Sequence, residues 1–202
     1  MLKKPVVCLM GPTAAGKTAL ALSLCEQYPF DIISVDSAMV YRGMDIGTAT
    51  PDAETLKTHP HRLINLCDPS QSYSAGQFCE DARHEIKLIH AQGRIPLLVG
   101  GTMLYFNLLQ RGFIDVPKAD LEIRQEIEQK AGLIGWEAFH CELKICDPES
   151  AARIHPNDKQ RIARALALFQ ATGQTLTQWQ ADQQWNLPNY AWTNLILMPS
   201  DR

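Results

Sequence analysis

An eight-residue glycine-rich segment near the N-terminus constrains the fold more than any other feature of this sequence. It fits the pattern G-x-x-x-x-G-K-[ST] at every fixed position and consists of Gly11, Pro12, Thr13, Ala14, Ala15, Gly16, Lys17 and Thr18. An apolar run precedes it and an Ala- and Leu-rich helical segment follows it, which is the context expected of a phosphate-binding loop. Backbone amides and the helix N-terminus would bind a di- or triphosphate there. Lys17 adds a positive charge, and the Thr18 hydroxyl can hold Mg²⁺.

Short apolar runs alternate with helical segments through the first part of the sequence. Such runs are typical of strands that are buried on both faces of a parallel sheet. Strands are predicted at residues 5–10, 31–35, 95–99 and 195–198. Helices are predicted at residues 16–28, 74–92 and 102–110, and residues 38–65 are predicted to be loop. The alternation predicts an α/β fold with a doubly wound parallel sheet of the P-loop NTPase type.

A helical block follows Pro117. Its helices are predicted at residues 119–131, 136–145 and 157–172. Ser74 with Gln77, and Asn157 with Gln160, have the spacing of capping boxes at helix starts. The predicted organisation is a core over residues 1–116, an inserted block over residues 117–190, and a return to the core over residues 191–202.

Composition excludes some classes of protein. The net charge of −3 argues against a broadly basic nucleic-acid surface, so any such surface must be local. None of the six cysteines forms a Cys-x-x-Cys pair, as expected for reduced thiols rather than a zinc site. The apolar runs are too short for a membrane span or a signal peptide. A cytoplasmic protein without a membrane partner is predicted.

A carboxylate is predicted beside the phosphates. Asp36 directly follows the strand at residues 31–35, and the carboxyl ends of parallel strands line the ligand crevice. The later strand ends in Gly100, Gly101 and Thr102 instead of the Asp typical of motor ATPases. Asp36 is therefore predicted to act as a general base or to hold the metal through water, unless it only stabilises a turn.

The third predicted helix of the block has a local basic face. Arg161 and Arg164 lie opposite the apolar stripe and suit phosphate contacts, although a solvated helix face is the alternative. Aromatic residues cluster after this helix and could either stack on bases or pack internally. They are Trp179, Trp185, Tyr190 and Trp192.

Taken together, the motifs resemble those of the bacterial tRNA dimethylallyltransferases, which prenylate adenosine 37 of tRNA. The resemblance runs from about residue 6 to the end of the sequence. It rests on the phosphate loop and on residues 33–37, Tyr41, residues 45–48, Asp68-Pro69, Tyr73-Ser74, residues 98–102, Tyr105, residues 153–158 and Gln160-Arg161.

The resemblance implies a chemistry. The donor is dimethylallyl diphosphate, the acceptor is N6 of adenine, and pyrophosphate is the leaving group, stabilised by the loop, Lys17 and Mg²⁺. Asp36 accepts the proton of the amine, and Thr13 contacts the diphosphate. The alternative is a phosphate-loop kinase that transfers a phosphoryl group from ATP to a small molecule or nucleotide.

The resemblance also implies contacts with the anticodon loop of tRNA. The expected contact residues are Asp36, Ser37, Ala38, Met39, Thr102, Arg124, Gln160, Arg161, Ile162, Ala163 and Arg164. A monomer is expected. The family continues with further helices, including an arginine that contacts the diphosphate, whereas this sequence stops at Arg202. A fragment of a longer enzyme is therefore expected.

Overall fold

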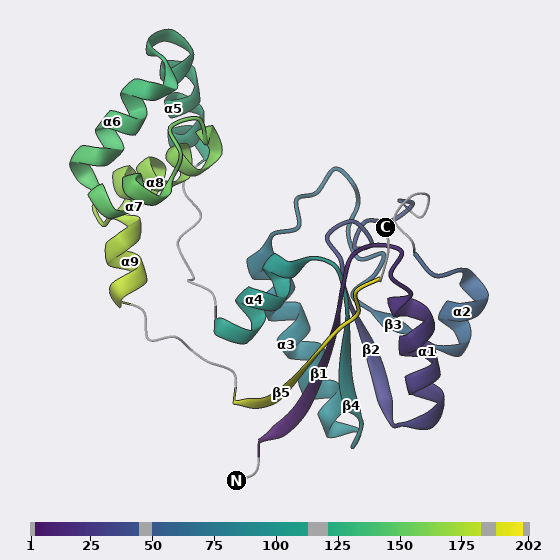
Figure 1. Cartoon of the computed structure of the whole chain (residues 1–202). Helices are drawn as coiled ribbons and strands as arrows, with labels where there is room; N and C mark the ends of the chain where they lie inside the picture. Colours follow the sequence, from purple (N-terminus) through teal and green to yellow (C-terminus); the bar gives the residue numbers. More distant parts are fainter. Residues whose placement is uncertain (1–2, 45–49, 113–120, 183–188, 200–202) are drawn as a thin grey trace. The chain divides into compact units, whose positions relative to one another are not determined.

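The computed structural model describes residues 3–44, 50–112, 121–182 and 189–199 (Figure 1). The chain forms two compact units. The first comprises residues 1–113 and 186–202, and the second comprises residues 114–185. These boundaries lie within a few residues of the predicted ones.

The first unit is built on a five-stranded, wholly parallel sheet in the order β3-β2-β4-β1-β5. The strands are β1 (Lys4–Met10), β2 (Phe30–Val35), β3 (His61–Arg62), β4 (Ile95–Gly100) and β5 (Tyr190–Ile196). β1 lies between β4 and β5, so the last strand returns to the core after the helical unit (Figure 1). The register places Leu9 between Val99 and Leu195.

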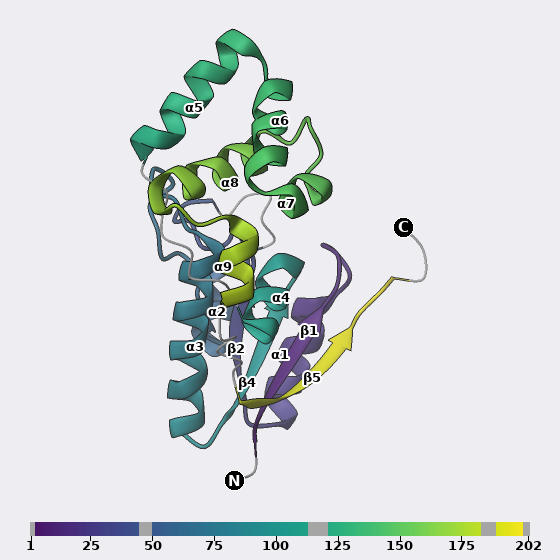
Figure 2. The same cartoon turned by 90° about the vertical axis from the view of Figure 1, so that its left-hand side faces the viewer.

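Helices cover both faces of the sheet, which confirms the predicted doubly wound α/β fold. Because successive strand side chains point to opposite faces, β1 contributes Cys8 and Met10 to one core and Leu9 to the other. The first core is closed by α3 (Ala75–Ala91) and α4 (Met103–Arg111), and the second by α1 (Lys17–Gln27) (Figure 2).

Local signals specify the start of α3 as predicted. The Ser74 hydroxyl accepts a hydrogen bond from the Gln77 amide at 3.2 Å, and the Gln77 side chain accepts one from the Ser74 amide at 2.8 Å. This capping box satisfies two amide groups that the first turn leaves without helical partners.

The second unit is wholly helical in its described residues. It contains α5 (Leu121–Ile134), α6 (Trp136–Cys146), α7 (Pro148–Arg153), α8 (Lys159–Thr172) and α9 (Leu176–Asp182). Its core includes Ile127, Phe139, Leu143, Ile162 and Leu166. No helix in the described part of the chain is long and apolar enough to cross a membrane.

A buried carboxylate ties two short helices of this unit together. Asp147 accepts hydrogen bonds from the Ser150 amide at 3.1 Å and from the Thr177 amide and hydroxyl at 3.1 and 2.6 Å. Burial alone would raise the pKa of Asp147, but these hydrogen bonds outweigh burial and hold the pKa below its usual range.

Several predicted elements need correction. The segment 38–65 is not all loop, because it contains α2 (Ala53–Thr58), capped by Asp52, and the short strand β3. The return strand begins at Tyr190, five residues earlier than predicted, because pairing with β1 outweighs the exposed polar residues Thr193 and Asn194. The short helices α7 and α9 were not predicted.

The predicted capping box of Asn157 and Gln160 was also wrong. Asp158 caps α8, and its carboxylate accepts a hydrogen bond from the Arg161 amide at 3.2 Å. The Asn157 amide instead donates to Nδ1 of His155 at 3.1 Å. Asp is as good an N-cap as Asn, so the adjacent residue takes the role.

Candidate active site

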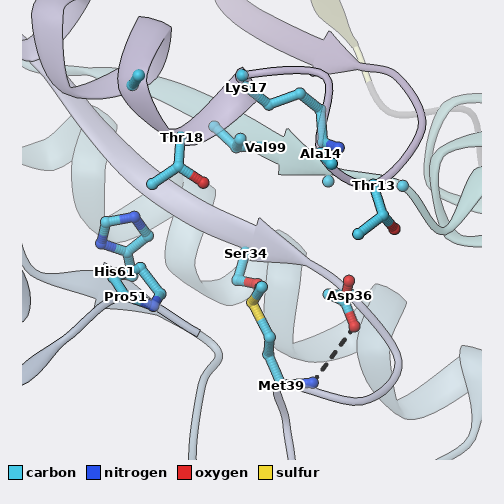
Figure 3. A pocket seen from close by; sticks show the side chains of 14 residues that line it. Thr13, Ala14, Lys17, Thr18, Ser34, Asp36, Met39, Pro51, His61 and Val99 are labelled. Carbon is cyan, nitrogen blue, oxygen red and sulfur yellow. Dashed lines mark hydrogen bonds between the residues drawn. The ribbon is translucent and has the colours of Figure 1, made fainter. Parts of the chain in front are cut away.

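A cavity of about 300 Å³ lies at the carboxyl end of the sheet (Figure 3). The phosphate loop and the start of α1 form one side of it. The ends of β2 and β4, together with Pro51 and His61, form the rest. All the described residues that line this cavity belong to the first unit.

The phosphate loop has the backbone conformation that its glycines predict. Gly16 has φ 83° in the left-handed region, which glycine adopts without steric cost, and Ala14 also has a positive φ of 65°. Gly11 is required for a different reason, since a Cβ there would collide with the carbonyl oxygen of Leu197. The loop therefore depends on the chain beyond β5 as well as on its own sequence.

Five of the eight predicted loop residues line the cavity. They are Thr13, Ala14, Gly16, Lys17 and Thr18. Gly11, Pro12 and Ala15 are not among its lining residues, but Pro12 closes the turn by accepting a hydrogen bond from Lys17 Nζ at 2.6 Å. Burial lowers the pKa of Lys17, and the charge of Asp36 opposes this shift. The ammonium and the carboxylate therefore act on each other through their charges.

Asp36 lies at the end of β2 and lines the cavity. Its Oδ1 accepts hydrogen bonds from the amides of Ala38 at 2.8 Å and Met39 at 3.3 Å. Figure 3 shows the other carboxylate oxygen pointing toward the side of the cavity that carries Thr13. Asp36 thus both stabilises a turn and presents a carboxylate oxygen to the cavity.

Thr102 connects the ends of two strands. Its hydroxyl accepts a hydrogen bond from the Ser37 amide at 3.1 Å and lies 3.5 Å from the Ser37 hydroxyl. Its own amide donates to the carbonyl of Val35 at 3.3 Å. A Cβ on Gly100 would collide with that same carbonyl, so glycine is needed where β4 passes the end of β2. The structure thereby brings Thr102 next to the turn that holds Asp36, Ser37, Ala38 and Met39.

Five residues of the cavity wall were not predicted as site residues, and two of them, Ser34 and His61, are polar; the others are Ala19, Pro51 and Val99. Ser34 is buried, and its hydroxyl donates to the sulfur of Met39 at 3.6 Å. His61 has Nδ1 2.8 Å from the carbonyl of His59. Burial is the main reason that the pKa of His61 is lowered, which favours the neutral imidazole at neutral pH. The sequence signals only a histidine on each side of Pro60, which does not indicate a ligand wall.

The tyrosines of the motif series contact other residues of the first unit. The Tyr41 hydroxyl accepts a hydrogen bond from the Tyr73 amide at 3.2 Å, and the Tyr73 hydroxyl donates to Asp81 at 2.7 Å. Tyr105 is buried and stacks on Phe78, with ring centroids 4.3 Å apart. Motif residues 45–48 lie outside the described residues.

The basic residues expected to contact RNA lie in the helical unit. Arg161 and Arg164 are exposed on α8, as is Gln160. Arg161 has Nε 3.4 Å from the carboxylate of Asp158, and Arg124 forms a similar pair with Glu128 within α5.

The expected RNA contact was wrong for two further residues, because both are buried. Ile162 and Ala163 belong to the core of the helical unit, with 0% and 1% of their surfaces exposed. Their side chains are not available to RNA, because the apolar stripe of α8 faces inward.

The aromatic cluster divides by position. Tyr190 and Trp192 pack against the sheet core and meet edge to face, with centroids 5.7 Å apart. The Trp179 indole donates to the Thr172 hydroxyl at 3.4 Å. Internal packing therefore accounts for Tyr190 and Trp192, and a hydrogen bond within the helical unit holds the Trp179 indole. Trp185 lies outside the described residues.

The residues that line the cavity could supply only some of the ligands of a magnesium ion. Thr18 places a hydroxyl on the cavity wall, and Asp36 places a carboxylate. Among the described residues there is no group of three or more His, Cys, Asp or Glu that could hold a metal by themselves. Mg²⁺ commonly keeps several waters and binds substrate phosphates together with one or two protein ligands, so this donor set suits an ion that arrives with a diphosphate.

Comparisons with known proteins point to one family. Residues 39–202 match the family described as IPP transferase. The chain is 56% identical over 203 residues to a tRNA dimethylallyltransferase of Coxiella burnetii, covering 100% of this chain and 65% of the relative. It is 54% identical over 198 residues to a tRNA dimethylallyltransferase of Thiobacillus denitrificans, covering 98% and 63%.

Similar solved structures point to the same family. A tRNA isopentenylpyrophosphate transferase of Bacillus halodurans is 39% identical, with a TM-score of 0.58 over 96% of this chain and 60% of that one. A eukaryotic dimethylallyltransferase acting on tRNA is 27% identical, with a TM-score of 0.82 over 96% of this chain and 48% of that one. The chain spans about 65% of the length of the Coxiella burnetii relative. The family match covers most of the chain and includes both the helical unit and strand β5. The chain therefore belongs to the IPP transferase family.

Proposed function

We propose that this chain transfers a dimethylallyl group from dimethylallyl diphosphate to N6 of adenosine 37 in the anticodon loop of tRNA. The observation that carries the proposal is the cavity, in which a phosphate-binding loop faces the carboxylate of Asp36. Membership of the IPP transferase family supports this reading of the cavity over other phosphate-loop chemistries. Pyrophosphate is then a leaving group rather than part of a nucleotide awaiting hydrolysis.

The loop binds and orients the donor. Its backbone amides and the N-terminus of α1 attract the diphosphate, with Thr13 as a hydroxyl contact and Lys17 as the charged one. When the allylic C–O bond breaks, the electron pair stays with the diphosphate oxygen. Preorganised positive charge stabilises that developing charge without reorganising during the reaction. Bound Mg²⁺, with Thr18 among its ligands, would neutralise further charge on pyrophosphate.

Asp36 accepts the proton as the general base. An adenine amine is a poor nucleophile because its lone pair is conjugated with the ring. As N6 bonds to the prenyl carbon, the amine becomes acidic and one N–H proton passes to the free oxygen of Asp36. The hydrogen bonds from Ala38 and Met39 fix the other oxygen, so the base is held in place.

The RNA contacts divide between the two units. We place the adenine beside Asp36, Ser37 and Thr102, which the structure brings together. Because the target base must leave its stack to reach a recessed site, an anticodon loop is a favourable substrate. Arg161 and Arg164 are proposed to bind flanking phosphates. Gln160 and Arg124 complete the proposed contacts.

The cellular setting is also a proposal. All six cysteines are free, which suits a reducing cytoplasm. We infer that the protein acts there as a monomer.

One labelling experiment tests the function. The full-length protein is mixed with unmodified tRNA and either dimethylallyl diphosphate labelled in the prenyl group or ATP labelled in the γ-phosphate. We expect prenyl label in tRNA and none in a control tRNA with guanosine at position 37. Movement of the γ-phosphate to an acceptor, without prenyl transfer, would instead favour the kinase alternative.

A further inference from the structure

The side of the cavity opposite the phosphate loop is largely apolar. Met39, Pro51 and the ring of His61 lie there (Figure 3). Among the described lining residues, the only fully charged side chains are Lys17 and Asp36. Because His61 is favoured in its neutral form, this side offers a ligand hydrocarbon contact rather than a second cation.

Met39 has the most flexible side chain of this wall, and the residue forms three hydrogen bonds. Its amide donates to Asp36 Oδ1 at 3.3 Å, and its carbonyl accepts from the Asn65 amide at 2.9 Å. Its sulfur accepts the hydroxyl proton of the buried Ser34 at 3.6 Å. A methionine side chain ordinarily samples many rotamers, and the hydrogen bond from Ser34 restrains this one.

The turn that positions Asp36 also positions Met39. Since Asp36 and Met39 are three residues apart, a ligand atom that reacts beside Asp36 has the Met39 side chain next to it (Figure 3). A donor whose diphosphate occupies the loop must direct its hydrocarbon away from Lys17. The apolar side of the cavity is the surface that lowers the free energy of that hydrocarbon by removing it from water.

We propose that Met39, held by Ser34, is the specificity-determining contact for the prenyl group of the donor and limits its length to about five carbons. This inference rests on the proposed function. It differs from the expected contact between Met39 and tRNA, because it assigns the side chain to the diphosphate ester.

Binding of unreactive analogues tests the inference without catalysis. Calorimetry in Mg²⁺ compares methyl diphosphate, 3-methylbutyl diphosphate and 3,7-dimethyloctyl diphosphate, which are saturated and cannot ionise as an allylic donor does. Each buried methylene is worth about fourfold in affinity. We therefore expect the wild-type chain to bind the five-carbon ester at least about tenfold more tightly than either other ester.

The variants make the side chain at position 39 either smaller or larger. Met39→Ala should lower the ratio of five-carbon to ten-carbon affinity by about tenfold or more, because the wall recedes. Met39→Phe should weaken binding of the five-carbon ester while leaving methyl diphosphate unchanged. Met39→Leu, of similar volume, should keep the wild-type ratio. Met103→Ala removes an exposed methionine outside the cavity lining and should match the wild type.

The possible failures are distinguishable. If both Met39→Ala and Met39→Phe retain the wild-type ratios while binding methyl diphosphate normally, the inference is wrong and the proposed function stands. The same holds if Met39 variants change only tRNA affinity. If the wild-type chain binds methyl and five-carbon esters equally and prefers ATP to both, the proposed function fails and the inference fails with it.

Discussion

Replacing Asp36 by asparagine separates the chemical role of this residue from its structural one. The side-chain oxygen of asparagine can still accept the amide protons of Ala38 and Met39, at 2.8 and 3.3 Å in the wild type. The turn should therefore persist. The exchange of charged for neutral hydrogen bonds costs stability on the order of 1 kcal/mol. What the variant lacks is the oxygen that takes the proton.

The expected loss of rate follows from that missing base. General-base catalysis contributes about 10²–10⁴ in rate, which corresponds to about 3–5 kcal/mol of transition-state stabilisation. Donor affinity should not fall, because the variant removes a negative charge from the cavity that receives a diphosphate. We expect a large decrease in kcat with little change in the binding of either substrate.

Single-turnover transfer of labelled prenyl to tRNA measures the chemical step, and titrations with methyl diphosphate and tRNA measure binding. Asp52→Asn is the matched control. Asp52 is exposed and accepts a hydrogen bond from the Thr55 amide at 2.8 Å to cap α2, a role that asparagine fills equally well. Asp36→Asn transferring within tenfold of this control would falsify the assignment of Asp36 as the base. Collapse of tRNA binding, with turnover of the remaining complex preserved, would make Asp36 a binding residue instead.

Three other predictions concern charge. Lys17→Ala should weaken methyl diphosphate binding about 10- to 100-fold, because a charged hydrogen-bond donor is lost, while the exposed Lys144→Ala should not; calorimetry measures both. Since burial lowers the pKa of Lys17, wild-type affinity should decline with rising pH before the ordinary lysine range, as the ammonium loses its proton. Arg161→Ala with Arg164→Ala should flatten the salt dependence of tRNA binding by about 0.7 units of slope per contact with a single-stranded loop and by nearly one unit per contact with a helix, and an unchanged slope would return both to a solvated helix face. Asp147→Asn should cost about 1–3 kcal/mol of unfolding free energy at neutral pH. Because the folded pKa of Asp147 is lowered, its contribution is complete above the ordinary aspartate pKa and is lost as pH falls through the folded value, so urea unfolding of the variant should show a weaker acid dependence.

The parts of the fold that were predicted correctly depend on neighbours in the sequence. The phosphate loop and the capping box of Ser74 are short patterns whose glycine, hydroxyl and amide groups act within a few residues. The buried strands β1, β2 and β4 are recognisable because both of their faces are covered, so almost every side chain is apolar.

The parts that were missed depend on distant partners. β5 is an edge strand whose residues are mostly exposed, so its sequence lacks an apolar run; Asn194 is held instead by Gln110, at 2.8 Å. The cavity wall depends on contacts that no local pattern encodes, such as the one between Ser34 and Met39. Thr102 was expected at the site through the family resemblance, but no local pattern encodes its hydrogen bond with Ser37, which is far away in the sequence.

The charges that face the phosphate loop bear on the choice between the two enzyme classes. A kinase that brings an anionic acceptor to ATP needs further cations opposite the loop, since like charges within a few ångströms destabilise each other strongly where water is excluded. In the described lining of this cavity, that side instead carries Asp36, the neutral ring of His61 and hydrocarbon. An uncharged adenine and a short prenyl chain meet no unfavourable charge there, and the amine finds a carboxylate for its proton. The arrangement matches a reaction in which only the leaving group is anionic.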